Sequence, residues 1–311
     1  MDELKLVERL RSEVPEDIDV TGAERQWRRR ALGGAARRQV PWRPILVSGL
    51  ATATCGGVLA VAVLSGRDTP ARPMGNVAAV LTQAADQTAH DPTPGPGQIV
   101  YQETVDRRRV GGTGRWYRIR TETWLPVEGA ATGLVRQRNS IRPGPGEQLP
   151  PDGEITLGPC PAAPPIERPY LGGLPADPDA LLRLLAGEGE GPRGERMWSA
   201  ASDLIDRPAP PRVRAALYRA IAEIPGVRLR TDAVDAAGRP GVAITRTQDG
   251  VRDELIFDRT THRFLGTRTV ITESGNPLGA PGTVTASSAL LRTAIVDHAP
   301  TPGPNAEPGN C

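Results

Sequence analysis

The sequence predicts an α+β domain with an antiparallel sheet, attached to a single N-terminal transmembrane helix. Three observations predict this architecture. Residues 45–66 contain no charged side chain, alternating segments occur at both ends of the region 98–298, and helical periodicity is confined to the middle of that region. Strands before and after a block of helices are typical of the α+β class.

Residues 44–66 are predicted to form the transmembrane helix. About twenty apolar residues span the roughly 30 Å hydrocarbon core of a bilayer. A secretion signal has a shorter apolar region near the N-terminus, whereas more than forty residues precede this one. A buried helix of a soluble domain and a cleaved twin-arginine signal are the alternatives. The apolar anchor residues are Ile45, Leu46, Val47, Leu50, Val58, Leu59, Val61, Val63 and Leu64.

The charges beside this stretch predict its orientation. Residues 25–43 carry seven arginines and no acid. The arginines that we expect to determine the topology are Arg28, Arg29, Arg30, Arg37, Arg38 and Arg43. The positive-inside rule then places the N-terminus in the cytoplasm and residues 67–311 outside the cell membrane. Residues 67–311 hold 28 bases and 28 acids, so composition does not favour nucleic acid or another polyanion as a partner.

The chain before the anchor is a short helical leader. Residues 1–24 contain three bases and eight acids, a net charge of −5. The residues Leu4, Val7, Leu10 and Val14 form one apolar stripe of a helix that ends at Pro15. A second short helix is predicted from about Thr21 to Leu32, and two short helices cannot bury a core of their own. The stripe therefore predicts a partner protein or a membrane surface, and a leader that only orients the anchor is equally open.

A linker and a helix, within residues 67–97, follow the anchor. The helix is predicted at 76–90, with Val77, Val80, Leu81 and Ala84 on its apolar face, and it ends at the Pro/Gly-rich residues 91–97. Strands are predicted at 98–105, 115–126 and 131–140, with a hairpin at the glycine-rich residues 107–114. Residues 141–170 are rich in Pro and Gly and are predicted to be a long loop.

Three helices and five strands complete the predicted domain. The helices lie at 176–187, 195–206 and 210–226, the first with Asp177 as its N-cap and Pro178 in its first turn. In the third, the buried stripe is Val213, Leu217, Ala220, Ile221 and Ile224. The strands lie at 227–234, 241–248, 252–258, 263–272 and 283–296, and residues 299–311 form a Pro/Gly-rich tail.

Two cysteines, Cys160 and Cys311, lie on the side of the anchor where disulfides persist. A bridge between them would tie the end of the chain to a loop about 150 residues earlier, at a gain of somewhat under about 5 kcal/mol in the chain-entropy model. Two unpaired thiols are the alternative, because spacing alone does not establish the geometry.

The sequence predicts no enzyme. His90, His262 and His298 are the only histidines, they are far apart, and no nucleophile-elbow, zinc-protease or phosphate-loop motif is present. We therefore expect no catalytic residue, no metal and no cofactor. The basic run Arg107–Arg109 is interpreted as a charged hairpin that resists further strand pairing.

The segments LPADPDALLRLL, PPRVRAALYRAIAEIPGVRL and DELIFDRTTHRFLGTRTVIT carry a resemblance. With the acidic leader, arginine stripe and anchor, they resemble a family of actinobacterial single-pass membrane proteins of unassigned activity, often encoded beside an extracytoplasmic-function sigma factor. The outer region is also similar to the LolA/RseB half-barrel, a curved antiparallel sheet with helices across its concave face. Residues 1–43 lack the H-x3-C-x2-C motif of zinc-type anti-sigma factors.

Two functional hypotheses follow. The resemblance implies an envelope signalling or regulatory protein, whose leader binds a cytoplasmic partner such as a sigma factor. The alternative is an anchored carrier or binding module for an apolar ligand. It predicts a cavity on the inner sheet face, lined by Tyr101, Tyr117, Ile119, Ile244, Ile256 and Phe264.

Overall fold

The computed structural model describes residues 77–110, 114–128, 131–147, 149–159, 163–187 and 191–309. These belong to one compact unit, residues 65–311. The predicted leader, arginine stripe and anchor lie outside the described residues, as do Cys160 and Cys311. Within the part of the chain that is described, no helix is both long and apolar enough to cross a bilayer.

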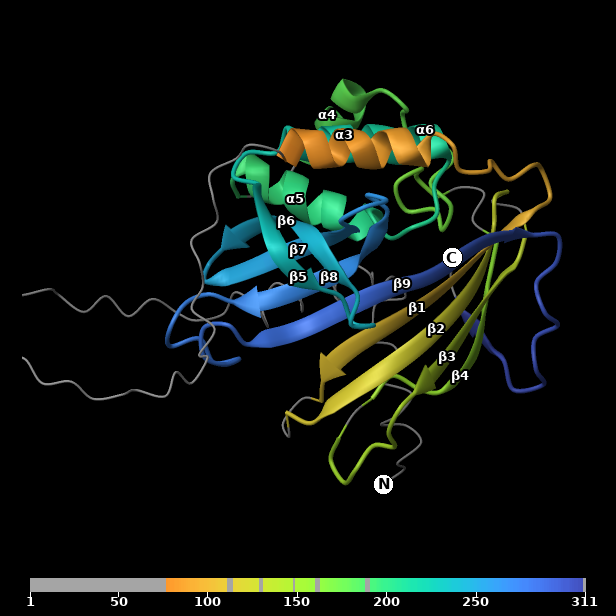
Figure 1. The fold of residues 1–311 in the computed structure, drawn as a ribbon. Helices are drawn as coiled ribbons and strands as arrows, with labels where there is room; N and C mark the ends of the chain where they lie inside the picture. Colours follow the sequence, from red (N-terminus) through yellow and green to blue (C-terminus); the bar gives the residue numbers. More distant parts are fainter. Residues whose placement is uncertain are drawn as a thin grey trace, which may run out of the picture. The chain divides into compact units, whose positions relative to one another are not determined.

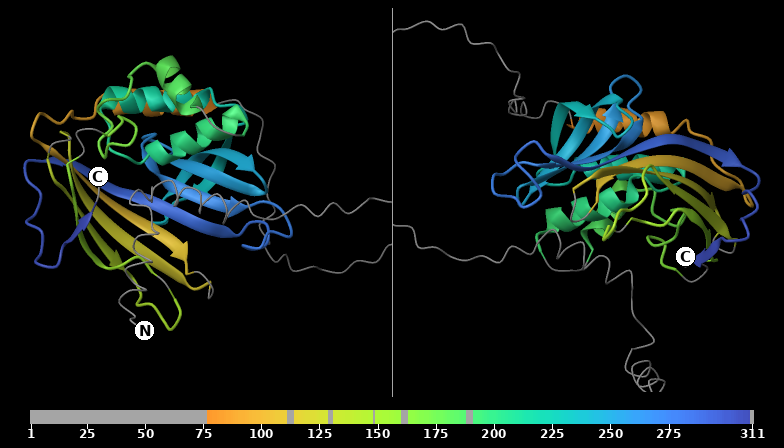
Figure 2. Two further views of the ribbon diagram at one scale, coloured as in Figure 1. Left: turned by 180° about the vertical axis from the view of Figure 1, so that it is seen from behind. Right: turned by 90° about the horizontal axis from the view of Figure 1, so that it is seen from below.

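One curved sheet of ten strands organises the unit (Figures 1 and 2). Its strand order is β10-β4-β3-β2-β1-β9-β8-β7-β6-β5, and every neighbouring pair is antiparallel except β10 with β4. The strands are β1 (Ile99–Arg109), β2 (Trp116–Pro126), β3 (Gly133–Asn139), β4 (Gly153–Leu157), β5 (Arg228–Val234), β6 (Pro240–Gln248), β7 (Val251–Asp258), β8 (Phe264–Ile271), β9 (Val284–Val296) and β10 (Glu307–Gly309).

Four described helices lie together on one side of the sheet (Figure 1). They are α3 (Val77–Thr88), α4 (Pro178–Ala186), α5 (Arg193–Leu204) and α6 (Pro211–Ala222). The Asp177 side chain accepts a hydrogen bond of 2.8 Å from the Ala180 N–H, so the predicted N-cap of α4 is confirmed. Gly187 ends α4 at φ 46°, a conformation that favours glycine.

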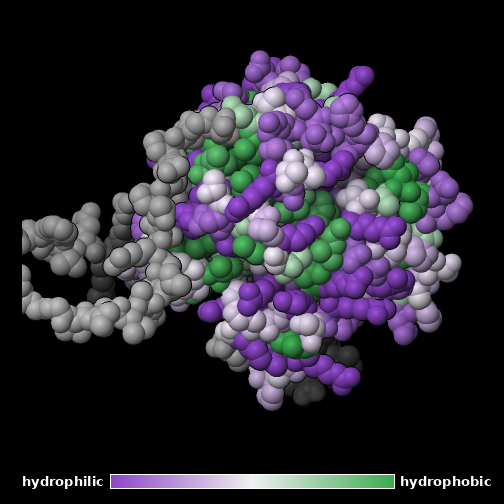
Figure 3. All heavy atoms as spheres, in the orientation of Figure 1, coloured by the Kyte–Doolittle hydropathy of each residue, from purple (hydrophilic) through white to green (hydrophobic). Residues whose placement is uncertain are grey.

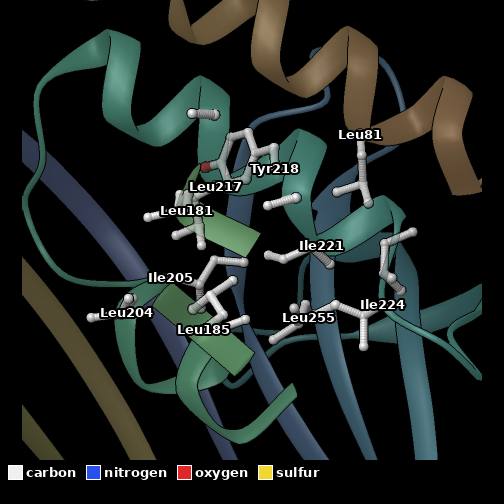
Figure 4. Close-up of a cluster of buried hydrophobic side chains, with 14 of the residues drawn as sticks. Leu81, Leu181, Leu185, Leu204, Ile205, Leu217, Tyr218, Ile221, Ile224 and Leu255 are labelled. Carbon is white, nitrogen blue, oxygen red and sulfur yellow. The ribbon is translucent and has the colours of Figure 1, made fainter. Parts of the chain in front are cut away.

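The main core lies between the helices and strands β6 to β8. Helix α6 contacts both α3 and α4, and its predicted stripe is buried from Val213 to Ile224. Figure 4 shows Leu81 of α3, Ile221 of α6 and Leu255 of β7 within this one cluster. Burial of such side chains stabilises the fold by about 1.5–3 kcal/mol each.

Most predicted elements are confirmed within a few residues, but two strands were missed. The prediction of a continuous loop at 141–170 is wrong, because Gly153–Leu157 forms β4. Glu307–Gly309 of the Pro/Gly-rich tail pairs in parallel with β4 as β10. Both strands are short, and they are the last two strands at one side of the sheet; β10 is the edge strand, where proline and glycine are tolerated. Local composition therefore gave no signal for them.

The predicted inner face is partly wrong, because its six residues do not share one face. The Gln102 amide donates to the backbone carbonyl of Asp206, between α5 and α6, so Gln102 faces the helices and its neighbour Tyr101 faces away. Ile256 likewise faces away, because it lies between Leu255 and Phe257 of the main core. The other four lie on the helix side of the sheet. There Ile244 and Phe264 belong to the main core, and Tyr117 and Ile119, the register partners of Arg108 and Asp106, form a separate cluster with Val110.

The pairing of β4 with β10 gives the predicted disulfide a structural context. Leu157 and Gly309 are register partners, and the Gly158 N–H donates to the Gly309 carbonyl over 3.3 Å. We expect non-reducing peptide mapping of residues 65–311 to recover a peptide that joins Cys160 to Cys311, and reduction to separate the two peptides. Quantitative alkylation of both thiols without a reductant would contradict this prediction.

Candidate functional site

A cleft of ≈ 450 Å³ opens between the helices and the sheet. Its walls come from segments far apart in the sequence: the end of α3 and the chain after it, the α5–α6 connection, α6, the β7–β8 turn, and strands β1, β8 and β9. Val100 of β1, Phe264 of β8 and Leu290 of β9 give it apolar lining. The volume lies within the roughly 300–1,000 Å³ of ligand pockets.

An aromatic row supports the inner wall of the cleft. The rings of Tyr218 and Phe257 meet edge to face with centroids 5.4 Å apart, and those of Phe257 and Phe264 do so at 5.7 Å. Phe257 is completely buried, so it fixes the two rings that reach the cleft. Burial raises the pKa of the Tyr218 hydroxyl, which stays neutral. The wall is therefore rigid and largely apolar.

Charged side chains gather at the rim of this apolar cleft. Asp91, just after α3, forms an ion pair of 2.8 Å with Arg263 of the β7–β8 turn. Arg239 pairs with Asp235 at 2.6 Å and donates to the carbonyls of Leu265 and Leu290.

Arg214 also lines the cleft and donates to the Arg207 carbonyl. Its guanidinium has no carboxylate within ion-pair distance among the described residues. The cleft lining thus includes Arg214 as an arginine that an anionic group can approach.

A second cleft of ≈ 320 Å³ lies beside the first and shares Tyr170 with it. It is lined by the ends of β2 to β4 and by residues 168–173. The segment that carries Tyr170 is held in place by Arg207, whose guanidinium donates to the carbonyls of Ile166 and Arg168. The Leu171 N–H donates to the Pro208 carbonyl over 2.9 Å. Tyr170 therefore forms a fixed partition between the two clefts.

Asp106 of β1 lies near enough to Asp206 of the α5–α6 connection for its charge to act on that carboxyl. Desolvation by the surrounding protein raises the pKa of the Asp206 carboxyl to about 6, and the nearby charge of Asp106 adds to the shift, although Asp206 is exposed at the surface. Burial also raises the pKa of Asp106, against the opposing effect of Arg108 at 3.6 Å. We therefore expect the protonation of Asp206 to change at mildly acidic pH.

The sequence did not indicate the residues of the cleft. Of the six residues predicted to line a cavity, Phe264 alone lines this one. His262 adopts φ 54° in the β7–β8 turn, beside the rim residues Thr261 and Arg263. Within the described ranges no three potential metal ligands lie close together. The predicted partner face Leu4–Val14, the arginine stripe and the anchor lie outside the described residues.

Comparisons with known proteins give little further identification. No family model matches the chain, and no curated protein matches its sequence. Among solved structures, 71% of the chain aligns with MucB from a crystal structure of MucB in complex with MucA(peri), at 16% identity. The alignment spans 56% of that chain, little more than half its length, with a TM-score of 0.28. A TM-score this low does not establish a common fold.

The Asp206 carboxyl should make stability depend on pH. Its folded-state pKa of about 6 lies above the ordinary value of 3.8, so the folded protein binds this proton more tightly than the unfolded chain. The resulting stability is present below about pH 4 and is lost as pH rises through about 6. We expect Asp206→Asn to remove this loss, so that the variant becomes more stable than wild type near pH 7 but not near pH 4.

Urea unfolding of residues 65–311 across this pH range checks the prediction. Asp106→Asn serves as a second variant, because removal of the neighbouring charge should lower the pKa of Asp206 and weaken the pH dependence. A difference between Asp206→Asn and wild type that does not change with pH would contradict the assignment.

Proposed function

We propose that this protein is a non-enzymatic, membrane-anchored envelope protein whose outer domain binds an amphipathic ligand, with an apolar chain and an acidic group, in the cleft between helices and sheet. The observation that carries the proposal is the cleft itself, with its rigid aromatic wall and Arg214 at the rim. Apolar lining with a few fixed polar groups is what ligand sites generally share.

The position of α3 supports a regulatory role for such binding. Thr88 and Asp91 line the cleft, and α3 is the first described helix after the predicted anchor. Its buried face packs against α6, and two ion pairs, Asp86–Arg219 at 3.0 Å and Asp91–Arg263 at 2.8 Å, hold it to the domain. An acidic ligand that competes for Arg263 would weaken the contact that holds the chain after α3.

We further propose that the leader connects this outer domain to a cytoplasmic regulator. The supporting observation is the stripe Leu4, Val7, Leu10 and Val14 in an acidic segment that is too short for its own core. The sequence resemblance implies a sigma factor as the partner. The outer domain would then bind the ligand outside the membrane, and the leader of the same chain would bind the regulator in the cytoplasm. A carrier without a cytoplasmic partner is the alternative.

Filling the cleft should abolish ligand binding. Ala209 lies in the cleft lining, so Ala209→Trp places an indole in the space that an apolar chain would occupy. We expect affinity for a fluorescent long-chain fatty acid to fall on the order of tenfold or more, because the ligand loses both space and apolar contact. The measurement is fluorescence titration of residues 65–311.

Ala280→Trp is the matched control, because Ala280 is exposed in the β8–β9 connection and does not line the cleft. It should bind the probe like wild type. Equal affinity of all three proteins, with unchanged melting temperatures, would show that the probe binds elsewhere.

The leader prediction concerns the full-length protein in its native membrane. Crosslinking followed by mass spectrometry should capture a transcriptional regulator with wild type, and should lose it when Leu4, Val7 and Leu10 are changed to Ser. Changing Asp2, Glu3 and Glu13 to neutral residues tests acidity separately from the apolar stripe. Identical partners for wild type and the serine variant would leave the leader as a device for orientation alone.

A further inference from the structure

The sheet has one face that packs against the helices and one face that points away from them. An arginine patch lies on the face that points away. It consists of Arg107 and Arg109 of β1, Arg118 and Arg120 of β2, and Arg138 of β3. Strand register places these residues on one face, because Val105 pairs with Arg120, Arg107 with Arg118, and Arg120 with Arg138. Figure 3 shows hydrophilic residues over much of the sheet face that β1 and β2 present.

The arrangement opposes like charges directly. Arg107 faces Arg118, and Arg120 faces Arg138, across neighbouring strands. Side chains in such pairs start about 4.5–5.5 Å apart, and like charges at that distance destabilise a sheet. Trp116 reduces the cost, since the guanidinium groups of Arg107 and Arg109 lie 4.3 and 5.1 Å from its ring centroid. The indole thus holds two cations in fixed positions on an exposed surface.

The same strands show what a charge-balanced surface looks like. Farther from the hairpin, the Tyr101 hydroxyl donates to Glu122 over 3.1 Å, and Arg136 pairs with both Glu122 and Glu154. In the patch, Arg120 alone has a carboxylate partner among the described residues, Glu103 at 2.7 Å. Asp106 does not neutralise the patch, because it faces the helix side, where Asp206 senses its charge. Within the described ranges, Arg107, Arg109, Arg118 and Arg138 therefore have no carboxylate within ion-pair distance.

We propose that the arginine patch docks the outer domain against the anionic phospholipid headgroups of the membrane. Guanidinium groups bind phosphate oxygens through paired hydrogen bonds, and an array on a sheet face suits a surface of many phosphates. Ten residues, 67–76, separate the predicted anchor from α3, a reach of at most about 35 Å. This short tether keeps the domain near the bilayer, where the patch can act.

Vesicle binding by residues 65–311, which form one compact unit with its own core, tests the proposal without the anchor. The variant changes Arg107, Arg109, Arg118 and Arg138 to Gln. The control changes four exposed arginines of other surfaces, Arg183, Arg193, Arg212 and Arg228, to Gln and has the same net charge. We expect wild type and control to co-sediment with phosphatidylglycerol vesicles and not with phosphatidylcholine vesicles.

Binding of the patch variant should be weaker on the order of several hundredfold, since four surface arginines are removed and each contributes about fivefold. It should also show less sensitivity to salt. Equal loss in the patch variant and the control, or no binding of wild type to anionic vesicles, would overturn the proposal. Binding to soluble polyphosphate without binding to vesicles would also overturn it. The cleft variant Ala209→Trp should bind vesicles normally, so failure of the ligand proposal is distinguishable from failure of this one.

Discussion

The antiparallel pairing of β1 with β9 is the constraint on which the rest of the described structure depends. Strands β1 to β4 and β5 to β9 pair with their neighbours in sequence. The pair β1–β9 joins the two groups across nearly 200 residues, from Ile99 opposite Val296 to Arg108 opposite Ala286. Such a long-range pair carries a large loop-closure cost. It also confines helices α4 to α6, which lie in the connection between the two groups, to one face of a continuous sheet.

The cleft is a direct consequence of this pairing. Its lining includes Val100 of β1, Leu290 of β9 and Phe264 of β8, three neighbouring strands whose side chains converge only when the two strand groups are joined. A bulge between Glu103 and Thr104 changes the register within the β1–β9 pair and bends the sheet locally. The chain has only two phenylalanines, Phe257 and Phe264, and both support the wall of this cleft.

Sequence patterns within one or two turns were sufficient to predict most helices and strands. They were not sufficient to predict which residues line the cleft. The spacing of Val213, Leu217 and Ile221 predicted the buried stripe of α6, and the Asp177–Pro178 pair predicted the start of α4, because both signals lie within one or two helical turns. Alternation predicts which residues of a strand share a face, but not which of the two faces meets the helices. Tyr101 and Ile256 were therefore assigned to the wrong face, and the ion pair Asp91–Arg263, whose partners are 172 residues apart, left no local signal.

The arginine patch shows why net charge is a poor guide to what a surface can bind. Residues 67–311 contain equal numbers of acids and bases, and on that basis composition argued against an anionic partner. The register of β1, β2 and β3 separates those charges, however, since Arg107 faces Arg118 at one end of the sheet whereas Arg136 faces Glu154 farther along. Screening limits electrostatic contact to about 8–10 Å at physiological salt, so a partner senses the local arginines and not the average of the domain. The charge of the sheet face that carries the arginine patch therefore follows from strand register and cannot be read from the composition of the domain.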